Sequence, residues 1–312
     1  MKNQLIQYLP LTRPRSTLKI LSKLNEAKVN VILDLEDSAQ DIFNLENNKK
    51  LKLAARDGLR YIIKNLDIST IDIDIFLRVN SIDSEYFQED IRLINSILKK
   101  DKIFFRGIFL PKVKSFNDVK IIFGSLDKDL SEIDIVPMIE TKQGLNNLSQ
   151  ILSEDKRKII KYLHFGHFDY CLDANIWPFV YPNNETFWSL TNHILEKLDH
   201  NIVYIHTPFP FPKDEKLFWA SVNHLERNYP DRNIMFATLN VDLSVSKRQK
   251  NINKIDIVPP LNIEESIDLA KYIVSNFGLN KANKRSFAVF DKCFIPPHQY
   301  LAAVKFLDGI KK

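Results

Sequence analysis

The chain has 312 residues, of which 45% are hydrophobic and 27% charged, and its 44 basic and 39 acidic residues give a net charge of +5. This length is typical of a single α/β barrel and is sufficient for a large buried core. The lysine pairs are isolated and form no basic block of the kind that binds nucleic acid, so we expect no nucleic-acid partner.

Cysteine usage and hydropathy bear on where the protein works. Cys171 and Cys293 lie far apart in the sequence, which is typical of a reduced intracellular protein. The N-terminal residues lack a secretory apolar core, and no apolar run approaches the roughly 20 residues of a membrane helix. We therefore expect a cytoplasmic protein without a membrane partner, in which Cys171 is a small core residue.

Apolar runs and helical patterns alternate along most of the chain. We expect strands at Leu5–Leu9, Val29–Leu33, Ile73–Leu77, Gly107–Leu110, Ile133–Ile139, Tyr162–Phe165, Ile202–His206 and Ile234–Leu239. We expect helices between them at Thr17–Ala27, Lys49–Asn65, Tyr86–Leu98, Asn117–Phe123, Gly144–Leu152 and Glu215–Arg227. Eight such units predict an α/β fold of the (β/α)₈ TIM-barrel type. An open doubly wound sheet is the alternative, but no glycine-rich phosphate loop follows any strand.

The last part of the chain differs in character. Residues 251–260 form a polar linker that ends in two prolines. An amphipathic helix at Glu264–Asn276, a short strand at Phe287–Phe290 and a terminal helix at Gln299–Leu307 are expected after it. We therefore predict a barrel domain over residues 1–258 and a small C-terminal helical appendage over residues 259–312, which packs on the barrel or on a neighbouring subunit.

Two acidic residues follow neighbouring strands of the predicted barrel. Glu140 comes directly after the strand at Ile133–Ile139, and Asp169 comes just after Gly166, which ends the next strand. The carboxyl ends of parallel strands build the active sites of such folds, and paired carboxylates suit a hard divalent cation such as Mg²⁺. Either acid could instead stabilise the N-terminus of the following helix. Their joint occurrence favours a metal site.

Arg78 ends a predicted strand and is suited to bind a substrate carboxylate with two hydrogen bonds. It could equally pair with the acids that follow the preceding strand, which are Asp34, Glu36 and Asp37. In an extended chain Asp37 points to the opposite side from the other two, so we do not expect all three acids at one site.

Two further groups have alternative interpretations. His164, His167 and Asp169 resemble zinc ligands, but the spacing on a strand and turn directs the two imidazoles apart, so we do not expect zinc. Lys112 could form a Schiff base, but its place after a proline at a strand end favours a positioned cation that binds substrate or pairs with an acid.

Several short runs together resemble one known family. They are LPLTRP from Leu9, DLEDS from Asp34, KLAAR from Lys52, RVN from Arg78, LPKV from Leu110, IETKQG from Ile139 and GHFDYCLD from Gly166. Their order and spacing over about residues 4–175 resemble the citrate lyase β-subunit branch of the HpcH/HpaI aldolase family.

This resemblance implies a (β/α)₈ barrel related to pyruvate kinase and the phosphoenolpyruvate enzymes, assembled as a homotrimer or hexamer. It implies Mg²⁺, or Mn²⁺ in its place, on Glu140 and Asp169, with Glu36 and Asp37 orienting water and Arg78 holding the carboxylate of a 2-oxo acid. The implied reaction is reversible carbon–carbon cleavage through a metal-stabilised enolate. We therefore expect a metal-dependent lyase or aldolase acting on a 2-oxo or 2-hydroxy acid, with Arg78, Glu36 and Asp37 as catalytic residues and Lys112 as a second substrate-binding residue.

The C-terminal part departs from the resembled family. Acyl-CoA members carry an I-H-P-x-Q signature near the eighth strand, whereas Ile234–Asn240 contains no histidine. An aspartate that reaches a neighbouring active site in malyl-CoA-type lyases corresponds to Pro296 here. Both differences argue against coenzyme A as a substrate carrier, and the run from Thr207 to Pro212 suggests a different pocket. A lyase acting on a CoA or acyl-carrier thioester, and a non-catalytic metabolite-binding homologue, remain the alternatives.

Overall fold

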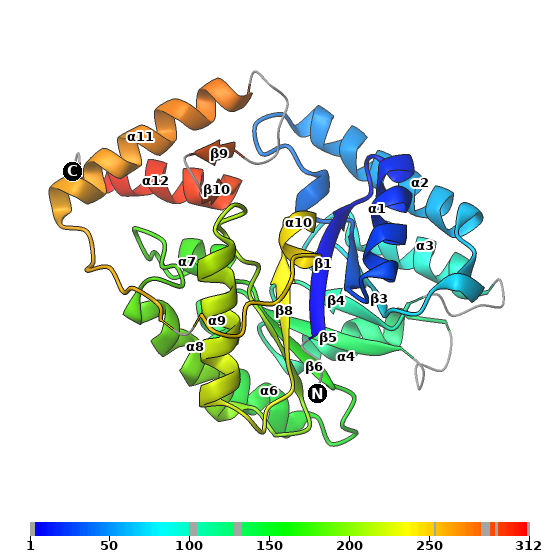
Figure 1. The fold of residues 1–312 in the computed structure, drawn as a ribbon. Coiled ribbons are helices and arrows are strands. Elements are labelled where there is room, and N and C mark those ends of the chain that lie inside the picture. Colours follow the sequence, from blue (N-terminus) through cyan, green and yellow to red (C-terminus); the bar gives the residue numbers. More distant parts are fainter. Residues whose placement is uncertain are drawn as a thin grey trace.

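The structure, a computed structural model, describes residues 4–99, 105–127, 133–252, 254–281, 288–290 and 293–310. Its centre is a closed barrel of eight parallel strands in sequential order, each paired with its neighbours in the chain and the last paired with the first (Figure 1). The strands are β1 (Gln4–Pro10), β2 (Asn30–Asp34), β3 (Ile75–Arg78), β4 (Gly107–Leu110), β5 (Asp134–Ile139), β6 (Tyr162–Phe165), β7 (Val203–His206) and β8 (Ile234–Thr238). The predicted (β/α)₈ barrel and its strands are confirmed.

Helices surround the barrel and connect its strands. They are α1 (Pro14–Glu26), α2 (Leu45–Asn65), α3 (Phe87–Leu98), α4 (Phe116–Ser125), α5 (Lys142–Asn146), α6 (Leu148–Glu154), α7 (His167–Asp173), α8 (Glu185–Lys197), α9 (Glu215–Asn228) and α10 (Val241–Ser244), with short 3₁₀ turns η1 (Asp37–Ala39) and η2 (Ile68–Thr70). The sequence missed α7, α8 and α10, and the helix predicted at Gly144–Leu152 is divided at Asn147 into α5 and α6. A short helix such as α7 or α10 leaves little periodicity to detect.

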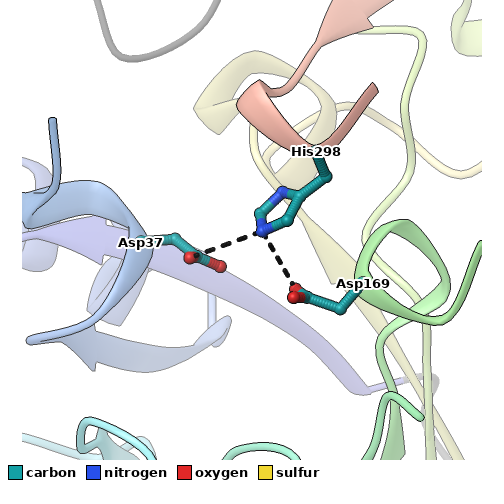
Figure 2. A group of neighbouring side chains, drawn as sticks. All are labelled: Asp37, Asp169 and His298. Atoms are coloured by element: carbon teal, nitrogen blue, oxygen red, sulfur yellow. Dashed lines mark ion pairs between the residues drawn. The ribbon is translucent and has the colours of Figure 1, made fainter. Parts of the chain in front are cut away.

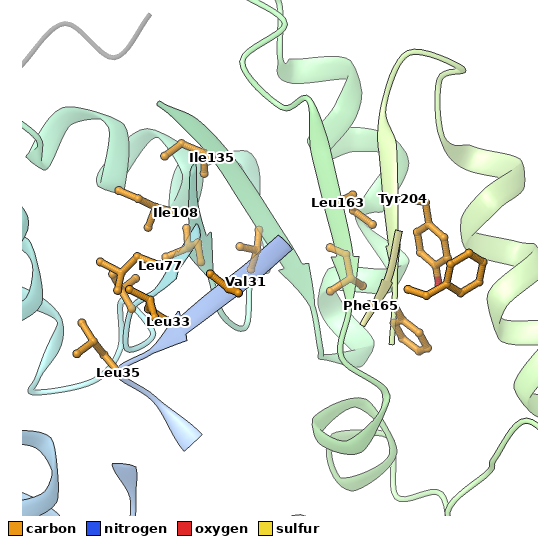
Figure 3. Packing of buried hydrophobic residues seen from close by; sticks show 14 of the residues in the cluster. Val31, Leu33, Leu35, Leu77, Ile108, Ile135, Leu163, Phe165 and Tyr204 are labelled. Atoms are coloured by element: carbon orange, nitrogen blue, oxygen red, sulfur yellow. The ribbon is translucent and has the colours of Figure 1, made fainter. Parts of the chain in front are cut away.

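The strands are apolar on both faces because both faces are buried. Side chains that point inward, such as Ile32, Phe76 and Phe109, fill the barrel interior. Their neighbours Val31, Leu33 and Leu77 point outward and pack against the helices, as Figure 3 shows for this outer cluster. Burial on both sides explains the nearly continuous apolar runs that made the strands predictable.

Two helices and a two-stranded antiparallel sheet follow the barrel. They are α11 (Ile263–Lys281), β9 (Ala288–Phe290), β10 (Cys293–Ile295) and α12 (Pro297–Ile310). α11 and α12 pack on each other through a small apolar core, and α12 also contacts α7 at the end of the barrel where the strands finish (Figure 1). The sequence did not predict β10. The proposed boundary at residues 258 and 259 lies in the irregular stretch before α11 and stays a prediction.

None of the helices in the described part of the chain combines the length and apolar character that a membrane crossing needs. The cytoplasmic location stays a prediction. Cys171 is fully buried, and burial raises the pKa of its thiol to about 12, in agreement with its predicted role as a core residue.

Candidate active site

The strands end around a cavity of about 50 Å³ beneath α12. Its walls include Arg78, Asp37, Glu140 and Asp169, four of the six residues predicted for the site. The other two, Glu36 and Lys112, are in contact with this wall, because Lys112 Nζ lies 3.2 Å from both Glu36 Oε1 and Asp169 Oδ1. The structure therefore brings all six predicted residues together.

The chain turns sharply after β2, and this turn gathers the acids. Asp34 accepts hydrogen bonds from the backbone N–H groups of Glu36 and Ser38 at 2.9 and 2.8 Å, which folds the chain back into η1. An aspartate that binds backbone two residues ahead is a common means of forming a turn. Because the chain after Asp34 is not extended, side-chain alternation does not apply to Glu36 and Asp37.

Arg78 contacts all three acids of this turn. Its Nε and Nη2 each donate to one oxygen of Asp34 at 2.7 Å, and its Nη1 lies 3.0 Å from both Glu36 Oε2 and Asp37 Oδ2. The expectation that the three acids do not share one site was therefore wrong. The guanidinium also lies over the ring of Tyr8, 4.8 Å from its centroid, on the cavity wall.

Lys52, on α2, fixes the same turn from outside. Its buried ammonium group donates to the backbone carbonyls of Leu35 and Glu36 and to Asn80 Oδ1, at 3.1, 2.7 and 2.6 Å. Asn80 is held in turn by the fully buried Asp90. The sequence does not predict this role for Lys52, although it lies in the KLAAR run, because two of its partners are backbone carbonyls that no pattern identifies.

Glu140 leaves β5 directly into the cavity wall, and the backbone of two other strand ends is shaped around it. Its Oε2 accepts a 3.0 Å hydrogen bond from the backbone N–H of Lys112. Its Oε1 lies so near Gly166 that a Cβ on that glycine would be 2.2 Å away. Glycine is therefore required at position 166, after β6, to leave space for this carboxylate.

Lys112 occupies the centre of the acidic cluster. Its backbone has a φ of +57°, a left-handed conformation that is uncommon for a residue with a side chain. The charge of Glu36, followed by that of Asp169, raises the pKa of Lys112 despite its burial. The side chain is therefore an ammonium cation, which agrees with the positioned cation favoured from sequence and speaks against Schiff-base chemistry.

The cluster brings several buried carboxylates close together. Five of them, Asp34, Glu36, Asp37, Glu140 and Asp169, lie in this region with the basic side chains of Arg78, Lys112 and Lys52. Burial, and then the charges of Asp169 and Glu36, raise the pKa of Glu140 well above its usual range. Burial and the charge of Asp37 also raise the pKa of Glu36. A hard divalent cation at these oxygens would relieve this repulsion, so the donor set fits Mg²⁺ or Mn²⁺ held by Glu140 and Asp169.

His298, at the start of α12, is a further residue of this site that the sequence did not predict. Its Nε2 lies 3.2 Å from Asp169 Oδ2 and 3.9 Å from Asp37 Oδ1, as Figure 2 shows. Burial would lower the pKa of His298, but the charge of Asp169 and a hydrogen bond to it outweigh burial and raise the pKa to about 9. The motif of the resembled family ends at the position of Pro296, which lines the cavity but carries no polar side-chain group. The signal that could have identified His298 is its position, two residues after Pro296.

Two other histidines near the cavity, His164 and His167, form hydrogen bonds with groups outside the acidic cluster. His164 Nδ1 donates to the carbonyl of Ile205 at 2.9 Å, so its Nε2 accepts from the hydroxyl of Tyr8 at 3.0 Å. His167 Nδ1 bonds to the hydroxyl of Thr207. Both nitrogens of His164 and one nitrogen of His167 are therefore engaged by other groups, and the expectation that zinc does not bind here stays a prediction.

The end of β8 lacks the histidine of the CoA-type signature and holds a different polar group. Gln7 Oε1 accepts hydrogen bonds from the hydroxyls of Thr238 and Ser244 at 2.5 and 2.6 Å. All three side chains are buried, and Leu239 beside them contributes an apolar surface to the cavity.

Comparison with known proteins identifies a related sequence and structures of similar fold. The chain is 24% identical over 164 residues to a citrate lyase subunit β-like protein of Deinococcus radiodurans, covering 52% of each protein, so it spans about half the length of this curated relative. The fold is similar to that of CitE from Mycobacterium tuberculosis in complex with magnesium, acetoacetate and coenzyme A, with a TM-score of 0.57, 14% identity and coverage of 99% of this chain and 98% of that one. It is also similar to a ternary complex of Haloferax volcanii malate synthase with pyruvate and acetyl-CoA, with a TM-score of 0.74, 13% identity and coverage of 100% and 92%.

The model of the HpcH/HpaI aldolase/citrate lyase family matches residues 7–178, which is more than half of the chain. The match begins within β1 and includes β2 to β6 and every carboxylate of the acidic cluster. The chain therefore belongs to the HpcH/HpaI aldolase/citrate lyase family of enzymes.

Proposed function

We propose that this protein is a divalent-metal-dependent lyase or aldolase that makes or breaks a carbon–carbon bond of a small 2-oxo or 2-hydroxy acid. The observation that carries this proposal is the pair of buried acids Glu140 and Asp169 in the cavity wall, with the pKa of Glu140 raised by burial and by the charge of Asp169. Such a pair is suited to hold Mg²⁺ or Mn²⁺, with further coordination positions left for substrate oxygens.

Arg78 is proposed to bind the substrate carboxylate. Asp34 fixes the plane of its guanidinium through two hydrogen bonds, and Tyr8 supports one face. Glu36 and Asp37 lie at Nη1 and would hold the arginine and the neighbouring polar groups in place. Lys112 is proposed to supply a second positive charge for the substrate. Its ammonium group lies between Glu36 and Asp169.

When bound, the divalent ion supplies the positive charge that stabilises an enolate on cleavage of the carbon–carbon bond. The residues around it exclude bulk water and limit the size of the substrate. Apolar side chains of Met138, Phe168, Pro208, Leu239 and Pro296 line a cavity of only about 50 Å³, a volume on the order of a few water molecules. This size favours a small acid.

A CoA or acyl-carrier thioester lyase is the second candidate. It is supported by the fold alone, since the similar CitE and malate synthase structures were solved with coenzyme A or acetyl-CoA. The absence of a histidine from the run Ile234–Asn240 and the small volume of the cavity argue against it. A thermal-shift titration with acetyl-CoA separates the two proposals, because only a thioester enzyme should be stabilised by it.

The test of the main proposal is calorimetric titration with Mg²⁺ and then with pyruvate or oxaloacetate. Wild type should bind the 2-oxo acid only in the presence of the ion, and Glu140→Gln and Asp169→Asn should bind neither. Glu196→Gln, an exposed acid on α8, is the control that should leave both affinities unchanged. Binding of the 2-oxo acid without a metal would refute the proposed site.

Turnover is measured next, with a panel of 2-oxo acids and aldehydes as substrates. Metal-dependent substrate binding without turnover across the panel would favour a non-catalytic metabolite-binding protein. A homotrimer or hexamer remains our proposal for the assembly, to be checked by light scattering of the intact chain.

A further inference from the structure

We propose that Asp37, Asp169 and His298 form a second cation position, which binds a divalent transition-metal ion and fastens α12 over the cavity. This inference goes beyond the proposed function. It shares Asp169 with that site but does not involve Glu140, and the chemical class of its ligand is different. Within the described part of the chain, these three residues are a group whose ligand atoms all lie within 4.8 Å of one another.

The distances between the ligand atoms suit one ion. Nε2 of His298 lies 3.2 Å from Asp169 Oδ2 and 3.9 Å from Asp37 Oδ1. Metal–ligand bonds of about 2.0–2.1 Å place neighbouring ligands roughly 2.8–3.4 Å apart in octahedral or tetrahedral geometry. His298 and Asp169 already have this spacing, and Asp37 would have to approach to reach it. In Figure 2 the imidazole of His298 points between the carboxylates of Asp37 and Asp169.

Each carboxylate is already oriented by its other oxygen. Asp169 Oδ1 contacts Lys112 at 3.2 Å, which leaves Oδ2 toward His298. Asp37 Oδ2 contacts Arg78 at 3.0 Å, while its Oδ1 faces His298 and accepts a bond from Gln40. Prior orientation of ligands by surrounding groups is a usual feature of metal sites.

His298 is delivered by an independently anchored helix. The hydroxyl of Tyr181 donates to Gln299 at 2.8 Å, and α12 packs on α7, so the imidazole has a defined position. The side chain of His298 is about nine-tenths buried, and its Nδ1 has no hydrogen-bond partner among the described residues. A buried imidazole that bonds through one nitrogen only is unusual for a purely structural histidine.

A hydrogen-bonded ion pair joins only two of the three residues. Nε2 carries at most one proton, and Asp169 at 3.2 Å takes it. Asp37 Oδ1, at 3.9 Å, is too far to accept a hydrogen bond from the same nitrogen and accepts one from Gln40 instead. A metal ion between the three atoms would engage all of them at once.

The ligand types select the class of ion. Two carboxylate oxygens and one imidazole nitrogen suit Mn²⁺, Co²⁺ or Zn²⁺, whereas Mg²⁺ prefers an all-oxygen environment. The position formed by Glu140 and Asp169 would keep its preference for a hard ion. Occupation of the new position would join η1, α7 and α12, three elements that are otherwise distant in sequence.

The experiment uses Mn²⁺ as the probe, with pulsed electron paramagnetic resonance to detect nitrogen from a bound imidazole. Wild type and Glu140→Gln should both show nitrogen modulation, because Glu140 is not a ligand of this position. His298→Asn should lose it and should lose about tenfold or more in Mn²⁺ affinity, as removal of one of three protein ligands predicts. His193→Asn, which changes an exposed histidine on α8, is the matched control and should retain the signal.

His298→Asn could lose the nitrogen modulation for two reasons, detachment of α12 or loss of the imidazole ligand alone, and the two must be distinguished. Trp177 contacts Phe306 of α12, so an unchanged tryptophan emission spectrum in metal-free His298→Asn shows that α12 remains docked. His298→Gln is the second variant if the spectrum changes. Absence of nitrogen modulation in wild type, or its persistence in the docked His298 variant, would overturn this inference. Neither result affects the proposed function, which depends on Glu140-dependent binding of the 2-oxo acid.

Discussion

Asp34 and Arg78 face each other across the paired strands β2 and β3, and both oxygens of the aspartate accept hydrogen bonds of 2.7 Å from the guanidinium. Both side chains are almost completely buried. The pair places a fixed guanidinium at the cavity wall, and the same aspartate also forms the turn that carries Glu36 and Asp37.

Asp34→Asn should therefore affect both stability and substrate binding. The substitution weakens two buried charge-assisted hydrogen bonds, while Glu36 and Asp37 still pair with Arg78, so we expect a loss of about 1.5–3 kcal/mol in the free energy of unfolding. Arg78 would lose its fixed orientation, so the KM for a 2-oxo acid should rise. Urea unfolding and steady-state kinetics measure the two effects. Asp57→Asn, which alters an exposed pair with Arg60, is the control expected to change neither.

Gly166→Ala should abolish metal binding at the Glu140 and Asp169 position. The new Cβ would lie 2.2 Å from Glu140 Oε1, so the carboxylate must move. Calorimetry with Mg²⁺ should show loss of binding.

Gly124→Ala, near the end of α4, is the control for this substitution, because a Cβ there meets no atom within 4 Å. It should leave binding intact and stabilise the protein by up to about 1 kcal/mol, as alanine is the better helix former. Normal Mg²⁺ affinity in Gly166→Ala would contradict the assigned geometry.

Lys52→Met should destabilise the turn after β2. It removes a buried donor and leaves the carbonyls of Leu35 and Glu36 and the side chain of Asn80 without this partner. The carbonyl of Leu35 keeps a bond from Asn80 and that of Glu36 keeps one from the Ala39 N–H. Only Asn80 Oδ1 is left without a donor, so we expect a loss of about 1–3 kcal/mol by urea unfolding. Lys50→Met, an exposed lysine on the same helix, should be within about 0.5 kcal/mol of wild type.

Buried neutral histidines predict a steep loss of stability in acid. Burial lowers the pKa of His164, His167 and His206 to about 3 from an ordinary value of 6.5. Because the unfolded chain binds these protons first, their contribution is fully present above pH 6.5 and is lost as the pH falls toward 3. Each group adds up to about 1.4 kcal/mol per pH unit to the slope of stability against pH.

His206→Gln tests this assignment by removing one of the three groups. Between about pH 6 and pH 4, the slope of the unfolding free energy against pH should decrease by about 1.4 kcal/mol per pH unit, which is the contribution of one proton. His193→Gln, at an exposed position, should keep the wild-type slope. An unchanged slope in His206→Gln would show that this histidine is not buried in its neutral form.

The local pattern of the chain determined the barrel and most of the acidic cluster. Strands buried on both faces produce apolar runs, and the polar residue that follows each run necessarily lies at the same end of a parallel barrel. This relationship by itself places Glu140, Asp169, Arg78 and Lys112 together. The resemblance to the family motifs added roles for Glu36 and Asp37, which lie within the matched residues 7–178.

Only the tertiary structure decided what these groups contact. The turn formed by Asp34 overrides the alternation of an extended chain, so Arg78 meets all three acids that follow β2. His298 reaches Asp169 across 129 positions of sequence, because α12 packs back on α7. Periodicity reports which side of its own element a residue occupies, but it contains no information about which distant element packs against that side.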